Sequence, residues 1–238
     1  MTQQLILNRP LKRSWLDAAL RAVRATSDPA RRDEILGEAL AQEYFGKVAE
    51  GKTIRVLKNI WWEPPQHALD FISWGREYAK PVDTRSLHIG AMLAVYPFIG
   101  SIYSAVGNII RQSESVHNQE VVRRVVSEWG DRESVRRAVL MALNTLRSLD
   151  VLVGDKNSSE KQLNQRVPVD PDLVPWFTHA LILTRRAESV DKNMVGSASE
   201  LFAIQFVGEP VPAPYPFLES FSEGGSRSVA ALRHFPRC

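Results

Sequence analysis

The longest apolar segment of the chain is the feature that most constrains its fold. Residues 86–110 (SLHIGAMLAVYPFIGSIYSAVGNII) contain no Asp, Glu, Lys or Arg and are long enough to cross a bilayer. Pro97 stands near the middle, and glycine, serine and asparagine residues dilute the hydrophobicity that a span needs. Proline is also favoured at the first position of a helix. The segment therefore favours two buried helices, 84–96 and 98–111, over a membrane protein.

Composition sets broad limits on function. The chain has 238 residues, enough to bury a core, and its net charge of +3 permits a polyanionic partner. The only cysteine is Cys238, so an internal disulfide and a cysteine-built metal site are excluded. The five histidines show no metal-ligand spacing, and the N-terminus does not resemble a secretory signal. We expect a cytoplasmic protein without a cofactor.

The segment GKVAEGKT, residues 46–53, has the spacing of a phosphate-binding P-loop. A working P-loop follows a buried strand, but the preceding residues 38–45 (EALAQEYF) have helical periodicity. No αβ alternation of a nucleotide-binding sheet follows. The segment therefore favours the junction of a helix pair over a P-loop ATPase.

This junction joins two predicted helices, 33–45 and 52–62, in a helix-turn-helix-like pair. Three cations lie on or beside the second helix and are candidates for contact with DNA phosphates: Lys52, Arg55 and Lys58. Lys52 and Arg55 are expected at the helix N-terminus, where backbone amides also favour phosphate.

A second helix pair is predicted between residues 118 and 149. Valines stripe the first helix, a Trp-Gly break ends it, and Asp131 is expected to cap the second. DVLVGD, residues 150–155, is typical of a strand entering a turn, and RVPV, residues 166–169, is its predicted return. The sequence thus predicts a winged helix-turn-helix around 117–169.

The second helix of this pair has two distinct faces at 100° per residue. Its core face carries Val135, Ala138, Val139, Ala142, Leu146 and Leu149. The opposite face carries Arg137, Leu140, Asn144, Arg147 and Ser148, with Arg132 and Arg136 near its margins. Arginine and asparagine side chains can recognise guanine and adenine in a major groove. Five further cations flank this face as candidate phosphate contacts: Arg123, Arg124, Lys156, Lys161 and Arg166.

Another interpretation of the same helix stays open. Charged residues on a helix are often only a solvated face, and nearby carboxylates cancel much of the positive charge. Leu140 in the middle of the polar face is suited either to a thymine methyl group or to a protein surface. A helical adaptor that docks a partner protein is therefore the alternative.

Three segments resemble a known family. GKTIRVLKNIWWEPP, GAMLAVYPFIGSIYSAV and EWGDRESVRRAVLMALNTLRSLDVL occur in the order found in the BrxA-like proteins of bacterial BREX phage-defence systems. The likeness covers about residues 10–155. These are small helical proteins with helix-turn-helix and winged-helix character, some described as inner-membrane from hydropathy alone. The resemblance implies DNA binding within an antiphage system, together with other proteins of a defence complex.

The expected fold is mainly α: a multi-helix domain with tandem helix-turn-helix units, the second a winged helix with a small β-hairpin. We expect an N-terminal helical domain, 1–112, and a winged-helix region with a C-terminal extension, 113–238. The tail around residues 223–226 fits either a hairpin or a terminal helix. No nucleophile elbow or metal motif is present in the sequence. The expected function is therefore a non-enzymatic accessory or regulatory protein that binds double-stranded DNA, without a membrane span or a small-molecule substrate.

Overall fold

Two buried helices form the centre of the computed structural model, which describes residues 9–41, 47–78, 81–155, 158–208, 215–223 and 227–233. They are α5 (Thr84–Val95) and α6 (Pro97–Ile110), and Pro97 begins α6 as the sequence predicts. Every residue of α5 from Arg85 to Val95 is buried. Within the described ranges, no one helix has the length and hydropathy to cross a membrane. α5 and α6 reach that length and hydropathy only together, as a pair bent by 118°.

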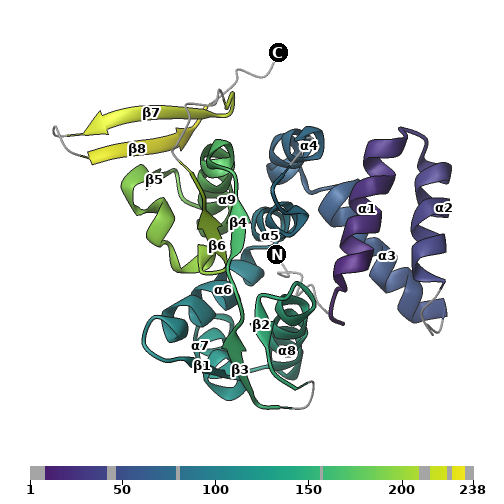
Figure 1. Ribbon diagram of the computed structural model, residues 1–238, viewed down its shortest axis with the longest axis horizontal. Helices are drawn as coiled ribbons and strands as arrows, with labels where there is room; N and C mark the ends of the chain where they lie inside the picture. The colour runs from purple at the N-terminus through teal and green to yellow at the C-terminus, as the bar shows by residue number, and fades with distance from the viewer. Residues whose placement is uncertain are drawn as a thin grey trace.

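The N-terminal helices stand together on one side of these central helices (Figure 1). They are α1 (Arg13–Ala25), α2 (Pro29–Leu40), α3 (Lys47–Trp61) and α4 (Leu69–Glu77), the last preceded by the short 3-10 helix η1 (Gln66–Ala68). The start of α2 follows local sequence rules, because the Asp28 side chain accepts a hydrogen bond from the Ala30 amide and Pro29 occupies the first turn.

The segment after α6 forms a helix pair beside a small sheet. Its elements are β1 (Ser115–His117), α7 (Asn118–Trp129), α8 (Glu133–Ser148), β2 (Leu152–Val153) and β3 (Glu160–Leu163). The sheet order is β1-β3-β2, and both pairings are antiparallel. Gly130, between the two helices, has a φ of 85°, a conformation that favours glycine. In Figure 1 this unit occupies the lower part of the view.

The C-terminal part adds one buried helix and two more sheets. Its helices are η2 (Pro171–Leu173), α9 (Val174–Arg185), η3 (Lys192–Ser197) and η4 (Ser199–Leu201). Its strands are β4 (Val167–Val169), β5 (Ser189–Asp191), β6 (Ile204–Phe206), β7 (Leu218–Glu223) and β8 (Arg227–Leu232). β4 pairs in parallel with β6, and the other sheet has the order β5-β8-β7. The tail is therefore an antiparallel hairpin, one of the two forms that its sequence allows.

Close contact between α5 and α9 joins the central and C-terminal parts. The indole of Trp176 is fully buried, stacks on Phe71 with ring centroids 4.3 Å apart and donates from Nε1 to the Phe71 carbonyl. A Cβ atom added at Gly90 would lie 2.2 Å from a Trp176 ring carbon. Glycine at this position is therefore required for the two helices to approach.

The expected fold class is wrong. The prediction of a mainly α fold with one small hairpin fails because the described residues contain three sheets. The predicted return strand, 166–169, does not pair with β2; β3 does, and it lies between the two predicted strands in the sequence. Residues 167–169 instead join β6, which is distant in the sequence. The prediction paired residues 150–155 with 166–169, whereas β2 pairs with the strand between these segments and β4 pairs with a strand far along the chain.

Candidate nucleic-acid interface

The two faces of α8 lie as its periodicity predicts. All six residues of the expected core face are buried: Val135, Ala138, Val139, Ala142, Leu146 and Leu149. On the other side Arg137 is exposed, Leu140 is 37% exposed, and Asn144 and Arg147 are half-buried. Arg147 donates to the Asn144 side-chain oxygen at 3.5 Å. The exposed side of α8 is thus polar with one leucine near its middle.

The expected cap of α8 is wrong. The residue at the N-cap position is Arg132, and it makes no side-chain capping bond. The Asp131 carboxylate instead accepts two hydrogen bonds from Arg136, at 2.7 and 2.6 Å. These bonds, together with the charge of Arg136, hold the pKa of Asp131 below its usual value. Arg136 engages both oxygens of the Asp131 carboxylate, which accounts for its role as an ion-pair partner in place of a helix cap.

The candidate arginines divide by whether they have partners in the protein. Arg124 pairs with Glu120 at 2.7 Å, and Arg132 donates to the Trp129 carbonyl at 3.1 Å. Arg123, Arg137 and Arg166 are exposed and have no ion-pair partner within the part of the chain that the structure describes. These three are the arginines of the unit that keep their donors available for an external anion.

The predicted phosphate contact by Lys161 is wrong. Lys161 is 2% exposed, and its Nζ donates to the Ser158 carbonyl at 3.1 Å. Burial and the neighbouring charge of Arg147 lower its pKa. Its side chain therefore closes the turn of the sheet. Lys156 lies outside the described residues.

A groove of about 810 Å³ runs between the start of α7 and the side of α8. Its polar walls include Asn118, Gln119, Arg123 and Arg136, and Val122, Val126 and Leu140 supply its apolar lining. The residue before α7, His117, gives no side-chain cap to the helix. The Asn118 amide donates to the Ser159 carbonyl at 2.7 Å, so only the first-turn amides after Asn118 are candidates for an acceptor from outside.

The segment before α1 covers the C-terminal half of α8. The Leu11 amide donates to Thr145 Oγ1, and the Arg13 amide donates to Ser148 Oγ, both at 2.9 Å. Because Ser148 is engaged in this way, the accessible part of α8 is its N-terminal half. This contact was missed from the sequence, since nothing local in α8 indicates which residues another segment will cover.

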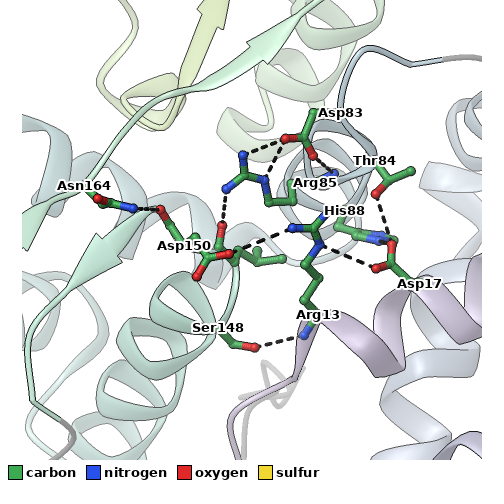
Figure 2. A network of polar contacts seen from close by, with 10 residues as sticks. Arg13, Asp17, Asp83, Thr84, Arg85, His88, Ser148, Asp150 and Asn164 are labelled. Atoms are coloured by element: carbon green, nitrogen blue, oxygen red, sulfur yellow. Dashed lines mark hydrogen bonds and ion pairs between the residues drawn. The ribbon is translucent and has the colours of Figure 1, made fainter.

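A network of polar side chains fixes the position of α8 relative to α1 and α5 (Figure 2). Arg13 lies 3.6 Å from Asp17 and 3.9 Å from Asp150, which follows α8. Nε2 of the fully buried His88 lies 2.9 Å from Asp17 Oδ1, and Arg85 Nη1 donates to the Leu149 carbonyl at 3.0 Å. Arg85 and His88 are buried at its centre and Asp150 is exposed at its edge, so the network joins the three helices from the core outward.

The protonation of this joint follows from its surroundings. Burial lowers the pKa of His88, so the ring is neutral and its Nε2–H donates to Asp17. Burial acts to raise the pKa of Asp17, but the hydrogen bonds from His88 and Thr84 outweigh it, and the pKa is lowered. His88 Nδ1 is buried without a hydrogen-bond partner among the described residues.

The N-terminal helix pair presents its cations differently. Lys52 and Arg55 are exposed, but α3 begins at Lys47, so the expectation that they lie at a helix N-terminus is wrong. Lys58 pairs with Asp33 at 2.6 Å and lies 5.1 Å from the Trp62 ring centroid. Of the three predicted cations of this pair, Lys52 and Arg55 therefore remain available.

The described part of the P-loop-like segment has no phosphate-binding geometry. Gly51, Lys52 and Thr53 lie within α3, and the buried Thr53 hydroxyl donates to the Ala49 carbonyl at 3.0 Å. Gly46 lies outside the described residues. In a helix the amides of these residues point along the axis to backbone carbonyls, so they cannot surround a phosphate.

No metal site is evident in the described ranges, where no three His, Cys, Asp or Glu side chains are grouped to hold an ion. Comparison of the chain with family models, curated proteins and solved structures gave no match. Any functional assignment therefore rests on the residues and on the geometry described above.

Proposed function

We propose that the protein is a DNA-binding accessory or regulatory protein that contacts duplex DNA through α7 and α8. The observation that carries this proposal is the groove between the two helices. Arg123 on α7 and Arg136 on α8 both line it, and it begins at the uncapped N-terminus of α7. A phosphate group in this groove would meet the unpaired Arg123 and the first-turn amides after Asn118, with Arg136, which pairs with Asp131, beside it.

The charge of the unit agrees with a polyanionic ligand. From Asn118 to Ser148 the sequence contains six arginines and four carboxylates, and no lysine. Internal pairs use Glu120 and Asp131. Exposed Arg123 and Arg137 are left without partners in the described chain. Phosphate contacts of this kind fix a protein on DNA without reading its sequence.

Base reading would fall to the exposed N-terminal half of α8. Arg137 can donate two hydrogen bonds to guanine, and Leu140 can contact a thymine methyl group. Asn144 is half-buried and engaged with Arg147, so it contributes less to this surface. The proposal therefore has its strongest support for contact with the DNA backbone. It assigns any sequence preference to Arg137 and Leu140.

The cellular role within this proposal comes from the sequence resemblance alone. The likeness to BrxA-like proteins supports a cytoplasmic, non-catalytic component of a BREX-like antiphage system. Neighbouring genes encoding other defence proteins would support that role. If no such genes lie nearby, the defence role would be withdrawn and the proposal would be reduced to a general DNA-binding protein.

The direct test is binding of a labelled random-sequence duplex, measured by fluorescence anisotropy. Arg123→Ala combined with Arg137→Ala should weaken binding by about tenfold or more, since each removes a phosphate or base contact worth about 1 kcal/mol. Neither side chain has a partner in the described chain, so folding should be unaffected. Arg21→Ala, on the exposed side of α1, is the matched control. Equal affinity of the double variant and the control would remove α7 and α8 from the interface.

The apolar lining of the same groove favours a second candidate, an adaptor that docks a partner protein. Val122, Val126 and Leu140 could receive an apolar side chain of a protein from the same defence system. This function predicts association that changes little with salt and is weakened by Leu140→Ser. It also predicts no retention of a duplex by the wild-type protein.

A further inference from the structure

The C-terminal hairpin leaves one edge of its sheet open. The sheet has the order β5-β8-β7, so β8 lies in the middle and β7 has a neighbouring strand on one side only among the described residues. Figure 1 shows β7 as the outermost strand at the top of the molecule, with β8 on its inner side. All six residues of β7 pair with β8 in a continuous antiparallel register, without a bulge. β7 is therefore a regular edge strand.

The sequence of β7 lacks the features that usually protect an edge strand. Lysine, proline or a bulge at such an edge discourages pairing with another chain. β7 has the sequence LESFSE, which contains neither lysine nor proline. Phe221 is 50% exposed, and Ser220 and Ser222 beside it are also exposed. The Glu219 carboxylate lies 3.2 Å from Nε of Arg233, so its charge is balanced within the chain. The edge is thus suited to pairing with a further strand.

Hydrogen bonding within the hairpin determines which backbone groups of β7 point outward. The Arg233 amide donates to the Phe217 carbonyl at 2.9 Å, and these two residues lie opposite each other one step beyond the paired strands. In an antiparallel pair of strands, opposed residues that exchange hydrogen bonds alternate with opposed residues that do not. Glu219 and Phe221 therefore bond to β8. The residues between and beside them direct their amides and carbonyls toward the open edge: Leu218, Ser220 and Ser222.

We propose that β7 pairs with β7 of a second copy of this chain, so that the two sheets join into one. An antiparallel pair with its two-fold axis at Ser220 places Ser220 opposite its own counterpart and Leu218 opposite Ser222. All three outward-pointing residues then form hydrogen-bonding pairs. Any shifted antiparallel register would place at least one of them opposite a residue outside the strand. The edge is therefore complementary to itself, as the interface of a symmetric dimer must be.

The exposed Phe221 ring supports the choice of a second copy. In the proposed register Phe221 lies opposite Glu219 of the other copy, so no two carboxylates are opposed. The two Phe221 side chains, one from each copy, occupy diagonal positions on the same face of the joined sheet. Diagonal neighbours are roughly 7 to 8 Å apart, within reach of aromatic side chains. The pairing would thus cover an apolar ring that the single chain leaves exposed.

This interface is separate from the groove between α7 and α8. The hairpin lies at the top of Figure 1, whereas α7 and α8 lie in its lower part. The dimer can therefore form whether or not the groove binds DNA. Arg123→Ala with Arg137→Ala should dimerise as the wild type does, so the two proposals fail separately.

Sedimentation velocity of the full chain without DNA tests the proposal. A single strand pairing is a small interface, so protein concentrations up to about 1 mM are needed. The wild type should show a reversible equilibrium of monomer and dimer. Ser220→Pro removes an outward amide and no bond to β8, so it should raise the dimer Kd by about tenfold or more.

Ser220→Ala is the matched control for this variant. It loses the same hydroxyl, which accepts a hydrogen bond from Lys192 at 3.3 Å, but it keeps the outward amide, so its Kd should be unchanged. A monomeric wild type, or an equal Kd in the two variants, would overturn the proposal. If Ser220→Pro does not fold, Phe221→Lys takes its place, because lysine opposes pairing at an edge.

A disulfide cross-link tests the register, in a Cys238→Ser background. Ser220→Cys would place two thiols at opposed positions with Cα atoms about 5.5 Å apart, which a disulfide can join. In the control, Ser222→Cys, the two thiols would be displaced by roughly 13 Å along the strands. Air oxidation should therefore link chains of the first variant into covalent dimers much faster than chains of the second. Equal rates, or no cross-link in either variant, would contradict the proposed pairing.

Discussion

The two helix pairs of this protein, α2 with α3 and α7 with α8, have similar composition but different geometry. From Pro29 to Trp61 there are six cations and five carboxylates, and from Asn118 to Ser148 there are six and four. In the first pair the two predicted cations that remain available, Lys52 and Arg55, lie on one helix. In the second pair Arg123 and Arg136 come from two helices and line one groove. Charge counts therefore do not separate the pairs, whereas the arrangement of the charges does.

The largest expected effect tests whether the two pairs share one core. Leu57 in α3 and Leu146 in α8 are both fully buried and belong to the same hydrophobic cluster. Leu57→Ala and Leu146→Ala should each lower the free energy of unfolding by about 3 to 4 kcal/mol, because each leaves a cavity. Urea denaturation followed by circular dichroism should show one transition in both variants. Two separate transitions would instead support independent domains at 1–112 and 113–238.

Acid should destabilise this shared core. Burial lowers the pKa of His179 from 6.5 to about 4. Between these values the unfolded chain binds a proton that the folded protein does not, so the free energy of unfolding falls as the pH falls from about 6.5 to 4. The full loss should be about 3 kcal/mol.

The same denaturation at several pH values checks this, with His179→Gln as the comparison. Glutamine retains a polar group for the Tyr215 hydroxyl, which lies 2.7 Å from His179 Nδ1, but does not titrate. The stability of this variant should depend less steeply on pH. An unchanged pH dependence would show that another group is responsible.

A smaller effect is expected at the joint between the first helices and α5. Asp17→Ala removes the acceptor of the buried His88 Nε2–H, so it should cost about 2 kcal/mol of unfolding free energy. Asp33→Ala removes the exposed carboxylate that pairs with Lys58, and this variant is the matched control. If both substitutions had equally small effects, the network in Figure 2 would not hold the joint.

The smallest effect is expected for Lys58→Ala in the first pair. The ion pair with Asp33 and the contact with Trp62 are partly solvated, and such interactions contribute under about 1 kcal/mol. The variant should also keep duplex affinity, because its ammonium group is already engaged within the protein. A large loss of affinity would show that Lys58 exchanges Asp33 for a phosphate.

Much of the helical framework could be predicted from the sequence, because amphipathic periodicity is a local property. The break at Pro97 and the buried face of α8 were predicted in this way, and both were confirmed. The arrangement of the sheets was not predicted, since strand pairing depends on residues that are distant in the sequence. β4 pairs with β6, with Val167 opposite Ile204. No residue near either strand indicates that the other strand is its partner.

The candidate site could be predicted only in part. Periodicity identified which arginines face outward, but not which of them have partners. Asp131 was predicted as a helix cap, whereas it pairs with Arg136. Lys161 was predicted to face a phosphate, whereas its amine reaches a carbonyl of its own turn. Such choices depend on side-chain positions within a few ångströms, which sequence spacing does not determine.

The salt dependence of duplex binding tests the central claim most directly. Each phosphate contact releases counterions, so the slope of log K against log salt reports the number of contacts. Between about 50 and 200 mM salt, Arg123→Ala with Arg137→Ala should reduce the slope by up to about 2. Lys52→Ala with Arg55→Ala should reduce it by less than half as much. A wild-type protein that binds no duplex, or equal slopes in the wild type and the Arg123 and Arg137 variant, would contradict the account.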